Sequence, residues 1–393
     1  MNFPKISATE FLQRIETFKG KMAEENIDIV VIYSNILDPS AVRYFSDFSG
    51  INESAAMIIP LEGAPILCSG QACHEWSRYK SPVKDIRIMP EVGEVSGVEY
   101  DLEGQQDFSD LFREMAEKYK IKKIGIIGDL IFPQVVYGKL QKQFPDAGII
   151  SAEMLMYEMR MNKSPAEQEC IRKASEIITN TFEYAIPRIK EGVTELDIQA
   201  DIEGQMLRLG AESYCHSFSP MTPSGPERSH LCMNRNTLRQ VKNGEIVAIG
   251  AGACYEGYNA PICTPVVPGD IVPKEIKDAV KTANEALNLV ASKMKPGVTS
   301  IELYGVYMDY LKKTGYDKYC PYGSVHSLGM LECETPFFSA KTPTVMIENM
   351  AVAIDAYFKG LPWGSFRIEE TLLINKNGAE LLTTFNKEYL ENY

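Results

Sequence analysis

The sequence predicts a two-domain α+β protein, in which an α/β domain over residues 1–157 precedes a domain over residues 158–393 built by internal duplication. Three observations support this prediction: apolar runs alternate with amphipathic segments in the first part, a repeat recurs at a constant offset in the second, and an apolar hairpin lies between the two copies. With 393 residues and 45% apolar content, the chain is long enough to bury two cores.

The first part predicts a series of strands and helices with no assigned chemistry. Residues 8–25 read as an amphipathic helix capped by Ser7 or Thr9, and the run IDIVVIYSN follows as a buried strand. Residues 54–70 predict two strands across a Glu-Gly turn, and KKIGIIGD predicts a central buried strand. Its glycines do not form the spacing of a dinucleotide or phosphate loop, so nucleotide binding is not supported.

The second domain begins near residue 158 and contains the repeat. Ser164, Pro165 and Glu167 form the start signal of a long helix. Further on, KEGVTELDI at 190–198 matches KPGVTSIEL at 295–303, an offset of 105 residues. A unit of two helices leading into a strand has therefore been used twice. It predicts a pseudo-two-fold domain with one curved sheet, helices on its outer face and a site on its concave face.

Residues 244–269 predict a β-hairpin between the two copies. Two apolar runs flank a tight turn at Tyr255-Glu256-Gly257, and folding there is expected to pair Gly250 near Pro261. Six small or uncharged residues are then expected to share one buried face: Gly250, Gly252, Cys254, Asn259, Pro261 and Cys263.

Composition excludes several classes of function. The formal charge of −13 argues against binding to a nucleic-acid backbone, which needs clustered Lys and Arg. An acidic surface suits a cationic or neutral small molecule. No apolar run approaches 18 residues and the first residues lack a signal-peptide core, so we expect a soluble protein without a membrane partner. Nine cysteines without a C-x-x-C pair indicate reduced thiols and a cytoplasmic location.

The hairpin pattern G-x-x-V-x-I-x-x-G-A-x-Y-x-G-Y resembles the metal-site hairpin of the pita-bread family (M24), which includes creatinase, aminopeptidase P and prolidase. The resemblance spans nearly the whole chain and implies a creatinase-type N-terminal domain followed by a pita-bread domain. In the metallopeptidases of this family, two metal-binding aspartates stand eleven residues apart on the hairpin. The matching positions here are Gly250 and Pro261, which offer no side-chain ligand, so a dinuclear metal site is not expected.

Three other segments resemble family motifs and supply the candidate site residues. SGPERSHLCMN places His230 where the family has a catalytic or substrate-binding histidine. YGSVHSLGMLECETP keeps His326 and Glu334 of the motif G-H-G-x-G-x-x-x-H-E-x-P but has Cys333 for its second histidine. Two strand segments complete the set, with Asp355 in place of a metal-binding Glu in MAVAIDAYF, and with Arg367 and Glu369 kept in FRIEETLLI.

The first functional hypothesis is a metal-independent hydrolase of the creatinase-like branch, needing no cofactor and cleaving a C–N bond of a small nitrogenous metabolite. His230 is expected to act as acid and base, because histidine titrates near neutral pH. His326 is expected to orient the substrate or water. The residues expected to bind the substrate are Glu334, Asp355, Glu369, Arg367 and Cys263.

Other possibilities stay open from the sequence. A divergent Xaa-Pro dipeptidase or aminopeptidase would hold one metal on His326, Asp355 and Glu369. A non-catalytic binding protein would have kept only the cleft. Cys263 and the other cysteines of the motifs are either thiol nucleophiles or apolar filler. The family resemblance further implies a homodimer, in which a loop near Tyr44, Phe45 and Asp47 closes the partner's cleft.

Overall fold

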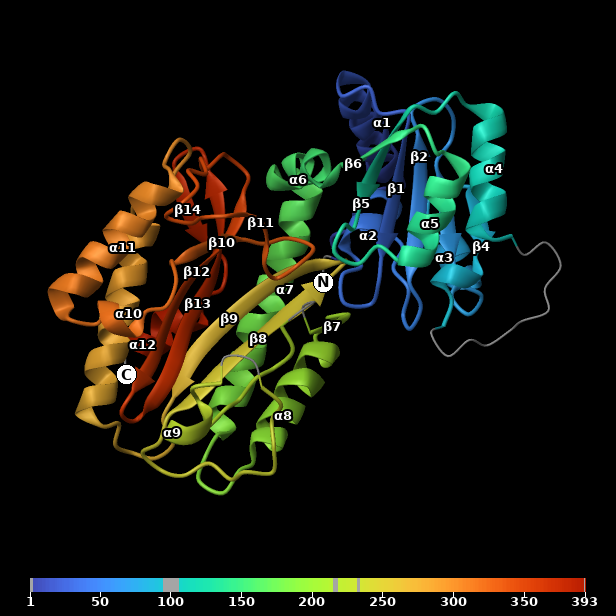
Figure 1. The fold of residues 1–393 in the computed structure, drawn as a ribbon. Coiled ribbons are helices and arrows are strands. Elements are labelled where there is room, and N and C mark those ends of the chain that lie inside the picture. Colours follow the sequence, from blue (N-terminus) through green and yellow to red (C-terminus); the bar gives the residue numbers. More distant parts are fainter. Residues whose placement is uncertain (1–2, 95–105, 215–217, 232–233, 392) are drawn as a thin grey trace. The chain divides into compact units, whose positions relative to one another are not determined.

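The computed structural model describes residues 3–94, 106–214, 218–231, 234–391 and 393, without the side chains of residues 213 and 214. The chain divides into two compact units, one formed by Ile6–Met159 and the other mainly by Arg160–Tyr393. Each unit contains a sheet of its own (Figure 1). No helix in the described ranges combines the length and apolarity that a membrane-spanning segment requires.

The first unit is built on a six-stranded sheet in the order β4-β3-β2-β1-β5-β6. Its central strand β1 pairs antiparallel with β2 and parallel with β5. Its strands are β1 (Ile29–Ser34), β2 (Ala55–Pro60), β3 (Ile66–Ser69), β4 (Asp85–Ile88), β5 (Lys123–Ile127) and β6 (Gly148–Ser151). Its helices are α1 (Ala8–Glu24), α2 (Ser40–Ser46), α3 (His74–Lys80), α4 (Phe108–Lys118), α5 (Gln134–Gln143) and α6 (Glu153–Met161), with a 3₁₀ turn at Pro90–Val92.

Helix α2 corrects one expectation from the sequence. The loop predicted to reach a partner subunit is a short helix whose Tyr44 and Phe45 are only 3% and 0% exposed. Asp47, at its end, pairs with Lys80 at 3.2 Å within the same unit. These three residues are held inside their own unit. The homodimer and a closing loop near them, where Leu37 and Ile51 are 81% and 72% exposed, stay predictions.

The second unit is built on an eight-stranded sheet in the order β11-β10-β12-β13-β9-β8-β7, with β14 paired to β13. Its strands are β7 (Ser213–Tyr214), β8 (Val247–Tyr255), β9 (Tyr258–Val266), β10 (Val325–Ser327), β11 (Glu334–Phe337), β12 (Ala351–Leu361), β13 (Gly364–Asn375) and β14 (Gly378–Leu381). Its helices are α7 (Pro165–Ala185), α8 (Glu195–Arg208), α9 (Gly225–Arg228), α10 (Lys274–Ala291), α11 (Ser300–Thr314) and α12 (Phe385–Glu391), with 3₁₀ turns at Ile186–Arg188 and Asp317–Tyr319. Helix α7 packs on β8 and β9, and α10 packs on β12 (Figure 1).

The internal duplication is confirmed at the level of single hydrogen bonds. Thr194 caps α8 and Thr299 caps α11, and each forms a capping box with the acidic residue three positions later. Ahead of the caps, the Gly192 amide donates to the Val241 carbonyl, and the Gly297 amide donates to the Met346 carbonyl. Both residues of this second pair lie 105 positions after their counterparts, so the repeat extends beyond the segment where the sequence shows it.

The hairpin forms as predicted, with a shift in register. Tyr255 pairs with Tyr258, so the turn consists of Glu256 and Gly257, both with positive φ (47° and 83°) as a tight two-residue turn requires. Gly250 therefore pairs with Cys263, two residues beyond the expected partner. The six residues predicted to share one face occupy directly opposed positions, and all are buried.

Candidate active site

Three neighbouring strands bring the chemistry-bearing side chains together. On β13, Arg367 and Glu369 point to one face of the sheet, because side chains alternate along a strand. Glu369 stands directly opposite Asp355 on β12 and opposite Cys263 on β9. The register of the sheet therefore places two carboxylates, a thiol and a guanidinium side by side.

His326 lies on β10, the next strand beyond β12, and faces two carboxylates. Its Nε2 lies 3.3 Å from Glu369 Oε1 and 3.6 Å from Glu332 Oε1. One ligand atom from each of these three residues lies within 4.8 Å of the other two. An imidazole and two carboxylates are a common donor set for a divalent transition metal. The three side chains could therefore hold one cation.

Asp355 belongs to a second group beside this cluster. Tyr322 donates a hydrogen bond of 2.7 Å to Asp355 Oδ2, and Arg367 donates one of 2.6 Å to the Tyr322 hydroxyl oxygen. Arg367 Nε also lies 3.4 Å from Asp355 Oδ1. Asp355 Oδ1 is buried and accepts no hydrogen bond from the described residues. Arg367 thus balances the charge of Asp355 and leaves one carboxylate oxygen available as an acceptor.

The charges of the cluster shift one another's protonation. Burial alone would lower the pKa of His326, but contacts with Cys333, Glu369 and Glu332 raise it well above its usual range. Burial would raise the pKa of Glu369, but the hydrogen bond and charge of His326 hold it below its usual range. Burial and the Glu369 charge raise the pKa of Glu332 to about 8. Without a cation the cluster therefore holds protons, which a bound metal would displace.

The place where the family has its first hairpin aspartate is packed with apolar side chains. Phe218, Met221 and Cys263 form a buried cluster over this position. A Cβ atom added at Gly250 would come 2.8 Å from Phe218 Cζ and 2.9 Å from Cys263 Sγ. Pro261, the second position, has no side-chain donor. A second metal of the kind implied by the family resemblance therefore does not fit this site.

The structure does not bring His230 to the cluster. Its Nδ1 hydrogen-bonds Ser365 Oγ at 2.6 Å, and its backbone carbonyl accepts from the Tyr357 hydroxyl. Ser365 and Glu369 are four residues apart on β13, which separates their Cα atoms by about 13 Å. His230 and His326 thus contact opposite ends of the same row of side chains. Arg367 and Cys263 line a small hollow of about 30 Å³ together with Ser229 and Leu231, the neighbours of His230 in sequence.

Glu334 does not face the site, which corrects its prediction as a substrate-binding residue. Its side chain is 1% exposed, accepts a hydrogen bond of 2.9 Å from Lys163 and is paired with Arg160. Burial would raise the pKa of Glu334, but these two cations hold it below its usual range. Both oxygens are occupied within the protein, so Glu334 has a structural role beneath the site.

Cys263 is not poised as a nucleophile. Its thiol donates to Glu369 Oε2 at 3.2 Å, and burial together with the Glu369 charge raises the pKa of Cys263 well above its usual value. A reactive thiolate needs the opposite environment. The structure therefore favours the role of a small filler that also orients Glu369.

A cavity of about 370 Å³ opens beside the cluster. His326, Glu332 and Asp355 lie on its wall, together with Tyr322 and Phe337. Neither Glu332 nor Tyr322 was predicted from the sequence as a site residue. Glu332 stands directly before Cys333, which occupies the position of the second histidine of the family motif. An acidic residue next to this missing ligand was the signal that could have pointed to Glu332. Tyr322 carried no such signal.

Comparison with known proteins now gives the family. Residues 169–376 match the description metallopeptidase family M24, and residues 14–162 match the creatinase/prolidase N-terminal domain. The chain belongs to metallopeptidase family M24. It is 31% identical over 283 residues to an Xaa-Pro dipeptidase of Pyrococcus horikoshii, a match covering 71% of this chain and 79% of the relative. It is also 29% identical over 384 residues to an Xaa-Pro dipeptidase of Pyrococcus furiosus, covering 96% of this chain and 99% of the relative.

Solved structures of this family show the same fold. The prolidase of Pyrococcus horikoshii OT3 superposes with a TM-score of 0.80 at 26% identity, covering 94% of this chain and 98% of that chain. The X-Pro aminopeptidase of Thermotoga maritima MSB8 superposes with a TM-score of 0.81 at 26% identity, covering 94% and 97%. The predicted creatinase-type and pita-bread architecture is therefore confirmed.

The comparisons correct the predicted activity. A metal-independent, creatinase-like C–N hydrolase was the first hypothesis, but the matched relatives are Xaa-Pro dipeptidases and the matched family is a metallopeptidase family. The broader expectation of a hydrolase agrees with this family. The expectation that metal is absent has no support, since His326, Glu332 and Glu369 form a set that could bind one cation.

Proposed function

We propose that this protein is a small-peptide hydrolase of the Xaa-Pro dipeptidase type that works with a single divalent cation held by His326, Glu332 and Glu369. The observation that supports this proposal is that one ligand atom from each of these three residues lies within 4.8 Å of the other two. Relatives aligned over 96% of the chain support the substrate class. The set differs from the one inferred from sequence, because Glu332 takes the place that was expected for Asp355.

The cavity supports a small substrate. Its volume of about 370 Å³ lies near the lower end of the range for small-molecule pockets. A divalent cation at its wall would supply Lewis-acid polarisation of the scissile carbonyl. The residues of the chain then have to bind and orient the peptide around that point.

Asp355 and Arg367 are placed to recognise the polar ends of a dipeptide. Asp355 lies on the wall of the cavity, and its Oδ1 accepts no hydrogen bond from the described residues, so we assign this carboxylate to the substrate ammonium group. Burial raises the pKa of Asp355 to about 6, and the charge of Arg367, whose guanidinium lies 3.4 Å from Asp355 Oδ1, opposes that rise. Tyr322 fixes both groups through its hydroxyl. This arrangement would hold the peptide before any bond is broken.

A binding protein without turnover is the second candidate, and two observations favour it. Gly250 is packed against Phe218, which removes the second metal. Cys333 stands where the family motif has a histidine. Both changes remove groups that the family motifs supply, while the cavity and the three-residue cluster remain.

Dipeptide cleavage tests the proposal. The purified protein would be incubated with Ala-Pro and, as a comparison, Ala-Ala in the presence of Mn²⁺, Co²⁺ or Zn²⁺, and free proline or alanine would be measured. We expect cleavage of Ala-Pro, loss of activity in His326→Ala and Glu369→Gln, and unchanged activity in Glu348→Gln, which alters an exposed acid outside the site. Saturable binding of Ala-Pro without cleavage under any metal would reject the hydrolase and support the second candidate.

A further inference from the structure

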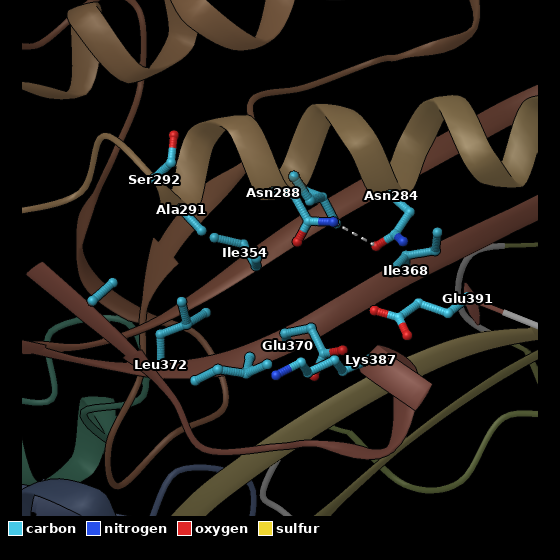
Figure 2. A pocket seen from close by; sticks show the side chains of 13 residues that line it. Asn284, Asn288, Ala291, Ser292, Ile354, Ile368, Glu370, Leu372, Lys387 and Glu391 are labelled. Atoms are coloured by element: carbon cyan, nitrogen blue, oxygen red, sulfur yellow. Dashed lines mark hydrogen bonds between the residues drawn. The ribbon is translucent and has the colours of Figure 1, made fainter. Parts of the chain in front are cut away.

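Figure 2 shows a second cavity, of about 430 Å³, beside the sheet of the second unit. It is bounded by α10 on one side and by β12, β13, β14 and α12 on the others. Neighbouring residues on the two central strands alternate between the two faces. Ile354 faces this cavity while Asp355 faces the site, and Ile368 faces this cavity while Glu369 faces the site.

The floor of this rear cavity is apolar. Ile354, Ile368 and Leu372 come from the sheet, and Leu287 comes from α10. All four side chains are nearly inaccessible, with exposures of 1–3%. The part of these side chains that faces the cavity is apolar, so an aliphatic group of a ligand can pack there without desolvating a polar group of the floor.

The rim of the cavity carries polar and charged groups. Asn284 and Asn288 lie one turn apart on α10, with the Asn288 amide 3.4 Å from Asn284 Oδ1 (Figure 2). Lys387 and Glu391 lie one turn apart on α12, and both are exposed. Within the described part of the chain, neither residue takes part in an ion pair. One cation and one anion thus stand at the edge of an apolar floor without a partner.

Glu370 is the third ionisable group of the cavity, and its carboxyl group already accepts a hydrogen bond within the protein. The residue is only 6% exposed. The Thr383 hydroxyl donates a hydrogen bond of 2.5 Å to its carboxyl group. Glu370 therefore closes the polar end of the floor, while Lys387 and Glu391 remain the charges that can reach a ligand.

We propose that the rear cavity binds a small zwitterionic α-amino acid with an aliphatic side chain. Its carboxylate would pair with Lys387, its ammonium group with Glu391, and its side chain would pack on Leu287, Ile354 and Ile368. The cavity volume accommodates such a molecule, and one positive and one negative charge match a zwitterion better than a singly charged ligand. This inference goes beyond the proposed peptidase and does not depend on it.

Helix α12 connects this cavity with the active site. Asn386 precedes Lys387 on that helix and is 2% exposed. Its side-chain amide donates to the Cys263 carbonyl at 2.8 Å and to the Glu369 carbonyl at 3.4 Å. The helix that would hold the ligand therefore also ties β9 to β13 at the residues that form the site. A ligand in the rear cavity contacts the back of the same strands.

Methyl NMR on isoleucine-labelled protein tests the proposal with L-leucine as the probe. Leucine should cause saturable shifts of the Ile354 and Ile368 methyl signals and leave Ile58, in the other unit, unchanged. Isoamylamine lacks the carboxylate and 4-methylpentanoate lacks the ammonium group. Each should bind at least about tenfold more weakly, because one charge-assisted contact is lost.

Charge variants test the assigned contacts. Lys387→Gln and Glu391→Gln should each weaken leucine binding at least about tenfold, since each removes one of the two ionic contacts. The matched controls are Lys277→Gln and Glu275→Gln, which alter exposed residues of α10 outside the cavity and should leave the affinity unchanged. Unshifted Ile354 and Ile368 signals at about 50 mM leucine, roughly tenfold above a weak Kd of about 5 mM, would overturn the proposal. Equal affinity in both charge variants and the parent would do the same. No peptide is cleaved in this experiment, so its failure is distinct from failure of the peptidase.

Discussion

Glu332 Oε1 lies 3.6 Å from His326 Nε2, on the same imidazole nitrogen that faces Glu369. This carboxylate comes from the segment between β10 and β11, not from the hairpin where the family resemblance implies two metal-binding aspartates. The hairpin positions Gly250 and Pro261 carry no ligand. The candidate ligands therefore come from β10, the segment between β10 and β11, and β13, and together they could hold one cation.

Replacing Glu332 by Gln should weaken the binding of Mn²⁺ or Zn²⁺ by more than about 100-fold. Loss of an outer-shell partner of a metal ligand already costs 10–100-fold, and loss of a charged ligand should exceed that range. Isothermal titration of chelator-treated protein measures the change. Glu348→Gln removes an exposed acid and is the control. Equal affinities for Glu332→Gln and the parent would remove Glu332 from the ligand set.

Replacing Gly250 by Ala should destabilise the protein by about 1–3 kcal/mol, the usual cost of overpacking a core. The new methyl group would meet Phe218 and Cys263 at less than 3 Å. Chemical denaturation measures the effect on the second unit. Gly305→Ala is the matched control, since nothing lies within 4 Å of the added atom and alanine favours the helix. A Gly250→Ala protein as stable as the parent would show that the Phe218 packing is loose.

The fold was predictable because its signals are local or repeated. The capping residues Thr194 and Thr299 recur 105 positions apart, and the same backbone hydrogen bonds precede them. The hairpin register was shifted by two residues, since the turn is centred on Glu256 and Gly257 and the sequence does not show where a tight turn is centred. Helix α2 was missed because all seven of its residues are buried, which leaves no amphipathic period to read.

Replacing Glu334 by Gln should destabilise the folded state by about 3–5 kcal/mol, as expected when one partner of a buried ionic group is removed. Arg160 and Lys163 would then be buried without an opposing charge. Denaturant unfolding measures this change, again with Glu348→Gln as control. A loss below 1 kcal/mol would contradict the structural role of this residue.

Acidification should lower the free energy of unfolding of the parent protein, because Glu334 becomes protonated. The folded-state pKa of Glu334 lies below its usual value, so its stabilisation is complete above the unfolded-state pKa, near 4.3. It is lost as the pH falls through the folded-state pKa. Unfolding free energies measured between pH 6 and pH 3 should fall more steeply for the parent than for Glu334→Gln. Parallel curves would contradict the assignment.

The site was less predictable than the fold, and particular residues show why. Glu334 was assigned to the substrate because its motif position suggested it, but its partners Arg160 and Lys163 are 174 and 171 residues away in sequence. Glu332 was passed over because the motif leaves its position unspecified. The chemistry of each carboxylate depends on which distant side chain it meets, and that follows from the register of the sheet.

Metal-dependent hydrolysis of Ala-Pro tests the central claim most directly. Chelator-treated protein would be titrated with Mn²⁺ while the release of proline is measured. One cation site on His326, Glu332 and Glu369 predicts that activity is absent without metal and reaches its plateau at one equivalent per chain. A plateau at two equivalents, activity that persists in chelator, or no hydrolysis at any metal concentration would contradict the claim.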